Sequence, residues 1–476
     1  MIFSSPIFLF IFLPAVFILY RLSRNINYKN ILLALAGVIF YSFGQLQYVY
    51  LLFLSVLINY LAGLIISRNR DCGKAVLAVA VAADIAMLCI FKYTDFIISN
   101  INAAAGCAIP LTGIELPIGI SFFTFQGISY VIDVYRYPES GEKSFIKVFL
   151  YISFFPRLLA GPIVKYADCA MQLSSRACST ETTAYGIRRF IKGLAKKILI
   201  SDVLGNIADS VFNIYLASGP ADVRLMWLGS ICYMLQIYYD FSGYSDMAIG
   251  IGNMFGFSFK ENFNYPYGAA SIKEFWRKWH ISLSGWFKDY LYIPLGGNRK
   301  GKARAMLNRM IVFICTGIWH GANWTFIFWG LCHGILSSLE DIGVIPTKKL
   351  QESRGGRIIG RVYTLLAVLL LFTVFRADSL GDAFKMIAIM FSGKISADGG
   401  RILTQLLTPA AVFILILAVA LAGNLVPYIK KRFNYTGIFE SSGMETAANL
   451  ACIVLFALSV FSLSKGGFSP FIYFQF

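Results

Sequence analysis

The feature that most constrains this chain is a series of apolar stretches that recurs from one end to the other. They occupy residues 3–20, 31–43, 49–66, 75–91, 118–134, 145–155, 225–239, 305–318, 324–336, 358–375, 409–425 and 447–463. A transmembrane helix needs about 20 mostly apolar residues, so the longer stretches are predicted to cross a bilayer. The shorter ranges 31–43 and 145–155 are predicted to be broken, interfacial or re-entrant elements.

The composition agrees with a chain that resides in lipid. The sequence is 57% hydrophobic and only 14% charged, whereas a soluble domain has about 25% charged residues. The deficit extends over the whole chain, so no sizeable soluble domain is expected. We therefore predict an all-α polytopic membrane protein with about 10 to 12 transmembrane helices, in a single domain over residues 1–476.

Basic residues between the apolar stretches indicate the orientation in the membrane. Arg21, Arg24 and Lys29 follow the first stretch without an acid, which places their loop in the cytoplasm and the N-terminus outside. The net charge of +17 is therefore attributed to topology and to contact with anionic membrane lipids. No nucleic-acid-binding motif accompanies this charge, and nucleic acid is not expected as a partner.

Residues 185–214 have a pattern of their own. Basic side chains such as Lys192, Lys196 and Lys197 recur between apolar ones such as Ile191 and Leu194. This spacing is typical of a basic amphipathic helix, which we predict to lie along the cytoplasmic membrane surface.

Residues 238–301 combine charged and aromatic side chains and do not read as a lipid-facing span. Asp240, Glu261 and Lys273 are among the charged members, and such groups are costly inside a membrane. We predict that this segment is buried in protein or lines a wet cavity, within a catalytic region of about residues 238–336.

The three histidines of the chain, His280, His320 and His333, all fall in this region. Histidine is the side chain whose proton is most readily moved near neutral pH, so the clustering points to a reaction site. His320 follows an apolar run and is flanked by tryptophans, surroundings that favour a neutral imidazole able to accept a proton. We predict that His320 is a general base for a hydroxyl; for any single buried histidine, a structural role is the alternative.

The other two histidines have less specific predictions. On a continuous helix His280 would share a face with Trp276 and Leu283. From there it would orient a substrate or stabilise a developing oxyanion, or else only cap a neighbouring helix. His333 stands beside Gly334, and helix packing is predicted for it.

Other chemistries find no support in the residue pattern. No H-x-x-x-H pair, cysteine or carboxylate accompanies the histidines at ligand spacing, so neither a metal site nor a bound cofactor is expected. A G-x-S-x-G nucleophile motif does not occur. The nine cysteines are scattered without a C-x-x-C pair, as expected of small apolar side chains rather than of a disulfide framework.

The loop 296–304 carries four cations between glycines, namely Arg299, Lys300, Lys302 and Arg304. We expect it in the cytoplasm, where it suits the phosphates of coenzyme A or an acidic carrier protein. A loop that serves only topology is the alternative.

Taken in order, several segments resemble the membrane-bound O-acyltransferase (MBOAT) family, in its bacterial AlgI and DltB branch and nearer to AlgI. They are FSSPIFLFIFLP from Phe3, PIGISFFTFQGISYVIDVYR from Pro117, FFPRLLAGPI from Phe154, YYDFSGYSDMAIG from Tyr238, EFWRKWHISLSGWFKDYLYIPLGGNRKG from Glu274 and GIWHGANWTFIFWG from Gly317. The resemblance runs over nearly the whole chain.

The resemblance implies a funnel of transmembrane, re-entrant and interfacial helices, with the two motif histidines near a narrow central tunnel. His320 matches the family's catalytic histidine and His280 its second motif position. An acyl thioester, either acetyl-CoA or an acyl carrier protein thioester, would arrive from the cytoplasm and the acceptor hydroxyl from outside. The expected activity is O-acetyl transfer in a bacterial plasma membrane, toward a cell-surface or exported polysaccharide.

The tail 471–476, FIYFQF, looks like the C-terminal motif of a small partner protein of the same branch, in which a tyrosine relays the acyl group. Tyr473 is therefore predicted to be a covalent acyl acceptor, since a phenol ester is activated for onward transfer. An aromatic anchor at the membrane interface is the alternative. A relay implies an extracytoplasmic SGNH-type acetyltransferase as partner.

Two other functions stay open at this point. The first is D-alanyl transfer from a carrier protein to teichoic acid, an activity of the same branch. The second is a polysaccharide or lipid transporter, in which a wet central cavity conducts the substrate and the histidines gate it.

Overall fold

The computed structural model describes residues 1–423, 425–432, 442–465 and 470–472. Within these ranges every regular element is a helix and no strand occurs, which confirms the predicted all-α fold class. The chain divides into two compact units: unit 1 is Met1–Phe190 with Tyr244–Glu261, and unit 2 is Ile191–Gly243 with Asn262–Phe476. The division into two units does not test whether residues 1–476 form a single domain, which stays a prediction.

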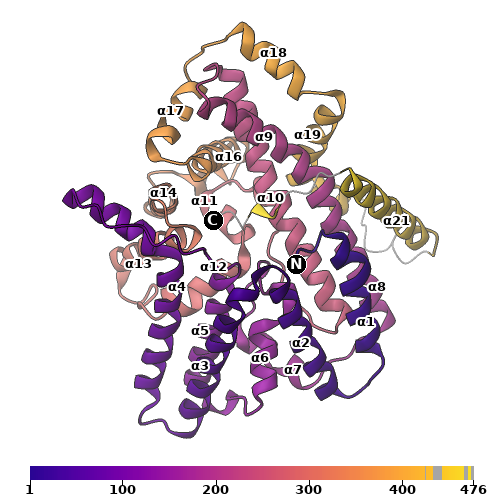
Figure 1. Ribbon diagram of the computed structural model, residues 1–476. Helices are drawn as coiled ribbons and strands as arrows, with labels where there is room; N and C mark the ends of the chain where they lie inside the picture. The colour runs from indigo at the N-terminus through magenta and orange to yellow at the C-terminus, as the bar shows by residue number, and fades with distance from the viewer. Residues whose placement is uncertain (424, 433–441, 466–469, 473–476) are drawn as a thin grey trace. The chain divides into compact units, whose positions relative to one another are not determined.

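Unit 1 contains the N-terminal apolar helices, of which α3, α4 and α5 pack against one another (Figure 1). A π-helical turn, Phe8–Phe12, leads into the first α-helix. The side chain of Asn25 caps α2 by accepting from the backbone N–H groups of Asn27 and Tyr28, donors that a helix start otherwise leaves unsatisfied. The helices are α1 (Leu13–Arg21), α2 (Ile26–Gln45), α3 (Val49–Arg68), α4 (Gly73–Ala105), α5 (Ile120–Arg136), α6 (Phe145–Ser153), α7 (Tyr166–Ser174) and α8 (Thr180–Ala195), which begins in this unit.

Unit 2 is built around the histidines. Its helices are α9 (Asp202–Leu216), α10 (Val223–Met254), whose last turns belong to unit 1, α11 (Ile272–Lys278), α12 (Ile281–Phe287), α13 (Gly301–His320), α14 (Trp324–Ile342), α15 (Thr347–Leu350), α16 (Arg354–Arg376), α17 (Leu380–Met390), α18 (Ala397–Leu406), α19 (Pro409–Ala422), α20 (Leu425–Arg432) and α21 (Ser442–Ser464). Two π-helical stretches, Lys196–Ser201 and Lys288–Tyr292, precede α9 and α13.

α13 and α14 form a helical hairpin whose turn lies directly after His320. Two glycines permit its close packing. A Cβ atom at Gly317 would lie 2.4 Å from the carbonyl oxygen of Phe326, and one at Gly330 would lie 2.3 Å from that of Phe313. Because any larger side chain would separate the two backbones, the glycines fix how closely His320 approaches α14.

Within the described residues, four helical segments are long and apolar enough to cross a membrane, or five if a bent pair counts as one span. The four are Ile26–Arg68, Gly73–Ala105, Arg354–Arg376 and Glu445–Ser464, and the bent pair is α18 with α19. The predicted 10 to 12 spans are therefore not reached by this criterion, because the other apolar stretches form helices that are shorter or less apolar.

Two predictions about short stretches have opposite outcomes. Residues 31–43 were predicted to form a broken element, and this is wrong: they lie inside α2, within the span Ile26–Arg68. Polar residues such as Asn27 and Asn30 extend the helix beyond the apolar run that the sequence displays. Residues 145–155 do form a short helix, α6, which ends at Ser153 before Pro156.

The basic segment 185–214 is helical, as predicted, but two of its cations are not available to a membrane surface. In unit 1, Arg189 donates to Asp246 at 2.8 Å and to both carboxylate oxygens of Glu261 at 2.9 and 2.6 Å. In unit 2, Lys197 is 3% exposed and lies between two carboxylates. A charge of this kind is buried only when it is paired, and the sequence pattern did not indicate the partners.

Candidate active site

Unit 2 collects the three histidines in one buried aromatic cluster. Their residual exposure is 1% for His280, 6% for His320 and 0% for His333. The burial predicted for the polar and aromatic segment 238–301 is thus confirmed at His280, and it is also confirmed at Asp240, which is 1% exposed. Buried polar groups are usually satisfied by hydrogen bonds, so the partners of each ring define what it can do.

His280 does not lie on a continuous helix, contrary to the prediction that it shares a helix face with Trp276 and Leu283. It sits between α11 and α12 with φ +44° and ψ +52°, in the left-handed region. The segment from Asn262 to Asn264 fixes this junction, because the N–H of Ile281 donates to the carbonyl of Asn262 and the N–H of Asn264 to that of Lys278. Few residues other than glycine adopt this conformation, and such positions are concentrated at functional sites.

The hydrogen bonds of Asn262 determine the tautomer of His280. The Oδ1 atom of Asn262 accepts from the backbone N–H of Ser282 at 3.1 Å and from its hydroxyl at 2.8 Å, so it is the amide oxygen and not the nitrogen. The Nδ1 atom of His280 lies 3.3 Å from the same oxygen and must donate to it. In a neutral ring the proton therefore resides on Nδ1, and Nε2 carries the lone pair that can accept a proton.

Burial also keeps His280 neutral. It lowers the pKa of His280 well below the usual value for histidine, and a positive charge on His320 would lower it further. His280 is therefore a neutral hydrogen-bond acceptor at physiological pH.

His320 is the last residue of α13, where the helix ends before the turn to α14. Aromatic rings enclose it: the ring centroids of Trp319, Trp329 and Phe375 lie 5.0, 5.3 and 5.3 Å from that of His320. These apolar surroundings are the ones that the sequence predicted from the flanking tryptophans.

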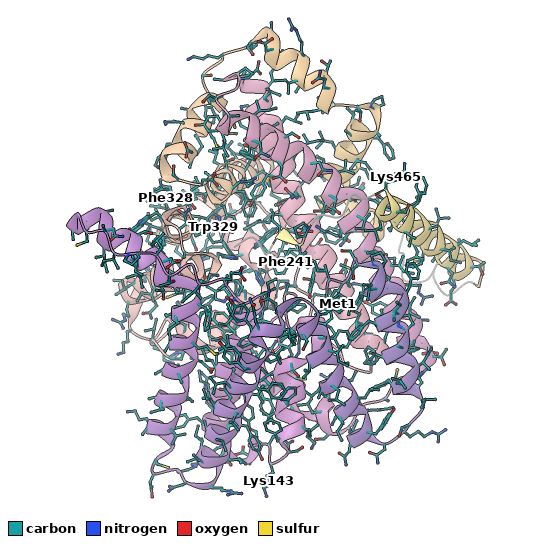
Figure 2. The ribbon with its side chains drawn as sticks, in the orientation of Figure 1. Met1, Lys143, Phe241, Phe328, Trp329 and Lys465 are labelled. Carbon is teal, nitrogen blue, oxygen red and sulfur yellow. The ribbon has the colours of Figure 1, made fainter. Side chains whose placement is uncertain are left out.

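Trp319 connects the two motif histidines. Its ring centroid lies 6.2 Å from that of His280 and 5.0 Å from that of His320. On its other side, His280 makes an edge-to-face contact with Phe241 at 4.5 Å. Figure 2 labels Phe241 and Trp329 among the closely spaced side chains of this unit. The structure thus brings His280 and His320 to one place, as predicted.

His333 belongs to the same cluster but has a different environment. The indole N–H of Trp276 donates to its Nδ1 atom at 3.2 Å, and the rings of Trp329 and Trp276 lie 4.9 and 5.2 Å from it. A histidine that accepts a hydrogen bond from one tryptophan and packs against two of them orders the interface between α11 and α14. This agrees with the packing role predicted for it.

The described end of the chain, Pro470 to Ile472, is held in unit 2 close to His280. The Nζ atom of Lys197 lies 2.8 Å from Asp202 and 2.7 Å from Asp240. The second oxygen of Asp240 accepts the backbone N–H of Ile472 at 2.7 Å. We call Lys197, Asp202, Asp240 and the backbone of Ile472 the tail anchor.

Phe471 extends the tail anchor toward the histidines. It is 1% exposed and its ring lies 6.2 Å from that of Phe241, the residue that contacts His280. The predicted relay residue, Tyr473, lies outside the described residues.

The sequence analysis did not identify Asn262, Trp319 or the tail anchor as parts of the site. A signal existed for the anchor, because Asp240 is an acid within an aromatic and apolar run, where an ionisable group needs a partner. No comparable signal marked Asn262, whose role depends on the fold around His280.

The four cations of the loop 296–304 remain at the surface. Arg299, Lys300, Lys302 and Arg304 are all exposed, at or just before the start of α13. They share the end of α13 opposite to His320.

Comparison with known proteins assigns the chain to a family. Residues 35–370 match the model of the membrane-bound O-acyltransferase family. The chain is 38% identical over 511 residues to the probable alginate O-acetylase AlgI of Azotobacter vinelandii, with 100% of both chains covered. It is 32% identical to the peptidoglycan O-acetyltransferase of Helicobacter pylori, with 100% of this chain and 98% of that protein covered. The teichoic acid D-alanyltransferase of Bacillus subtilis is 28% identical over 54% of this chain and 68% of its own length.

The chain belongs to the membrane-bound O-acyltransferase family. It is a multi-pass membrane enzyme that transfers acyl groups, and its full-length relatives include O-acetyltransferases. The resemblance stated from the sequence motifs is thereby confirmed, including the greater similarity to the AlgI type than to the D-alanyltransferases. The transporter interpretation does not fit this membership.

Proposed function

We propose that the protein transfers acetyl groups from a cytoplasmic thioester, acetyl-CoA, toward hydroxyls of a cell-surface or exported polysaccharide. His320 and His280 form the transfer site, and Tyr473 carries the acetyl group to a separate extracytoplasmic transferase of the SGNH type. The names of the full-length relatives, an alginate O-acetylase and a peptidoglycan O-acetyltransferase, support acetyl as the acyl group.

The observation that carries this proposal is the pairing of two buried histidines around Trp319. One of them, His280, is held as a neutral ring with its proton on Nδ1 by the hydrogen bond to Asn262. Burial removes competing water, so that a proton taken from a hydroxyl stays in the site. An acyl transfer between a thioester and a hydroxyl needs a base in such surroundings.

The chemical step balances with the residues at hand. The acceptor oxygen bonds to the carbonyl carbon of the thioester while His320 takes the hydroxyl proton. The carbon–sulfur bond then breaks, and the thiolate leaves and receives this proton to become a free thiol. His280 orients the acceptor by accepting a hydrogen bond at Nε2, or assists in the proton transfer.

The tail anchor supports Tyr473 as the acceptor in the first transfer. Tyr473 follows Ile472, whose N–H is bound to Asp240, and Phe471 packs on the ring that contacts His280. A phenol in place of the final acceptor would give a tyrosine ester, which an outer transferase can then discharge.

The exposed cations of the loop 296–304 suit the approach of an anionic donor. Arg299, Lys300, Lys302 and Arg304 would attract acetyl-CoA or an acidic carrier protein to the cytoplasmic end of α13. Loss of a single charge there should slow donor association more at low salt than at high salt.

The test uses purified protein in lipid nanodiscs and acetyl-CoA labelled in the acetyl group. Label should appear on the wild-type protein, together with free thiol. It should be absent from His320→Ala and from Tyr473→Phe. Mass spectrometry of the C-terminal peptide should place the label on Tyr473.

The controls separate the parts of this proposal. The variant His333→Gln keeps an acceptor for the indole N–H of Trp276 and should retain labelling. Label that persists in Tyr473→Phe would remove the relay but not the transferase. Neither label nor thiol from a folded wild-type protein would refute acetyl-CoA as donor and favour D-alanyl transfer from a carrier protein.

A further inference from the structure

Unit 2 has a second group of basic side chains besides the exposed loop 296–304, and this second group lines a pocket. It lies between α11, α14, α15 and the start of α16 and has a volume of about 530 Å³. This is within the range of about 300 to 1,000 Å³ that small-molecule sites occupy. We call it the cation pocket.

Cations dominate the lining of the cation pocket. Five of its side chains are basic, namely Lys273, Arg277, Lys348, Arg357 and Arg361. Only two carboxylates, Glu274 and Glu340, line it as well. The pocket therefore offers an excess of positive charge to whatever occupies it.

Both carboxylates are already used within the protein. Glu340 is 3% exposed and accepts the backbone N–H groups of Ile272 and Lys273 at 2.6 and 3.1 Å, so it caps the start of α11. Glu274 is paired with Lys278 at 2.7 Å and accepts the N–H of Ala270. Among the described residues, neither acid lies within 4.0 Å of a pocket arginine, although Arg361 is near enough to Glu274 to attract its charge.

Fewer of the basic side chains of the pocket have ion pairs within the protein. Lys273 is paired with Asp341, and the Nε of Arg357 donates to the carbonyl of Gln351 at 2.7 Å. Among the described residues, Arg277, Lys348 and Arg361 form no ion pair within 4.0 Å, and the buried Nε atom of Arg361 has no hydrogen-bond acceptor. A buried guanidinium donor of this kind needs an acceptor, which a water or an anionic ligand supplies, and the excess of cations in the pocket favours an anion.

The hairpin places the cation pocket at one defined end of unit 2. α13 runs from the basic loop to His320, and α14 returns from Trp324 to Ile342. Arg309, in the first half of α13, is paired with Asp341 at the end of α14. The pocket therefore shares the end of the hairpin that carries the basic loop, the end expected in the cytoplasm.

We propose that the cation pocket is a phosphate-binding site, and that the phosphates of the coenzyme A donor are its ligand. Arginine presents paired N–H groups that match phosphate oxygens, and two arginines with a lysine suit a ligand that carries several phosphates. The assignment of the donor rests on the proposed function. The headgroup of an anionic phospholipid offers the same chemistry and is separated from coenzyme A by the experiment.

The experiment measures binding of labelled coenzyme A, the free thiol, to the full-length protein in nanodiscs of phosphatidylcholine. Arg277→Gln and Arg361→Gln should each weaken binding by about tenfold or more, since charge-assisted hydrogen bonds are lost. Lys385→Gln, at an exposed lysine of α17, is the matched control and should bind as the wild type does. Arg277 is exposed, so its replacement does not threaten the fold.

A second arm identifies the source of the phosphate. Nanodiscs that contain phosphatidylglycerol should not abolish coenzyme A binding if the donor is the ligand. If the pocket variants instead lose retained phosphatidylglycerol, measured by native mass spectrometry, and bind coenzyme A normally, the phosphate site stands and the donor assignment is refuted. If the pocket variants bind coenzyme A and phosphatidylglycerol as the wild type does, the site is overturned. A larger loss of coenzyme A binding in Arg299→Gln than in the pocket variants would overturn it as well.

Binding without turnover keeps this proposal separate from the proposed function. His320→Gln should bind coenzyme A as tightly as the wild type, because the histidine lies at the opposite end of α13. A protein that binds coenzyme A in the cation pocket but never releases thiol from acetyl-CoA would refute the transfer reaction and leave the site intact.

Discussion

The two units bury ionisable side chains in different ways. In unit 1, Asp84 of α4 is fully buried, and the amide of Asn59 donates to both of its oxygens at 3.2 and 3.0 Å while Ser55 adds a third hydrogen bond at 3.4 Å. In unit 2, His280 and His320 lie where helices end, surrounded by rings. The carboxyl group of Asp84 is held by side chains of α3, whereas the rings of His280 and His320 meet around Trp319 where two helices end. A buried polar group such as Asp84 holds two helices together, whereas the buried histidine pair is available for chemistry.

The largest expected effect is a loss of catalytic rate on replacement of His280, and it tests whether the buried histidines of unit 2 take part in the reaction. His280→Gln can still donate to Asn262 but cannot accept and release a proton, so kcat should fall by about 10² to 10⁴. Thiol release from acetyl-CoA measures the rate, and circular dichroism reports the fold. A loss of less than about tenfold would mean that His280 only positions the chain.

The next largest expected effect is a loss of stability at the tail anchor, because its charged side chains are buried and paired. Lys197→Met leaves Asp202 and Asp240 without a cation and should cost about 3 to 5 kcal/mol of stability. Adding Asp240→Asn to the same chain should restore part of this loss. Thermal unfolding of the single and the double variant measures these changes in stability. A double variant that is no more stable than Lys197→Met alone would argue against a buried ion cluster.

A smaller effect is expected in unit 1, and it should leave catalysis unchanged. Asn59→Leu removes the donor to both oxygens of Asp84 and should cost about 1 to 3 kcal/mol. The rate per folded molecule should equal that of the wild type. A reduced rate would show that unit 1 takes part in the reaction and that the comparison between the units fails.

The smallest effect concerns Asp222, before the start of α10. Hydrogen bonds from the side chain of Arg224, and then from the backbone N–H groups of Ser396 and Arg224, hold the pKa of Asp222 well below its usual value. A lowered folded-state pKa stabilises the fold above the unfolded value of about 3.9 and loses this contribution as the pH falls through the folded-state value. Asp222→Asn should therefore cost about 1 kcal/mol at pH 7 and progressively less below pH 4.

The unfolding midpoint of Asp222→Asn and wild type, measured from pH 7 downward, tests this linkage. A difference that stays constant with pH would contradict it.

The parts of the site that the sequence predicted are those that depend on residue type. Histidine is rare in this chain and confined to one region, so His280 and His320 were identified without a fold. The apolar stretches 305–318 and 324–336 on either side of His320 were also predicted, and they form most of α13 and α14.

The parts that were not predicted depend on residues far apart in the chain. Lys197 resembles the other cations of its helix, and only the fold brings it to Asp240 and to the described end of the chain. The left-handed backbone at His280 likewise depends on the segment that begins at Asn262. In both cases a tertiary contact overrides the periodicity on which the prediction rested.

The central claim is that His320 and His280 of unit 2 form the site of acyl transfer. Its most direct test is the first turnover of thiol release from acetyl-CoA by the protein in nanodiscs, compared between wild type, His320→Gln and His333→Gln. We expect His320→Gln to lose at least about a hundredfold in rate and His333→Gln to match the wild type per folded molecule. Equal rates for His320→Gln and wild type, or equal losses for the two variants, would contradict the account.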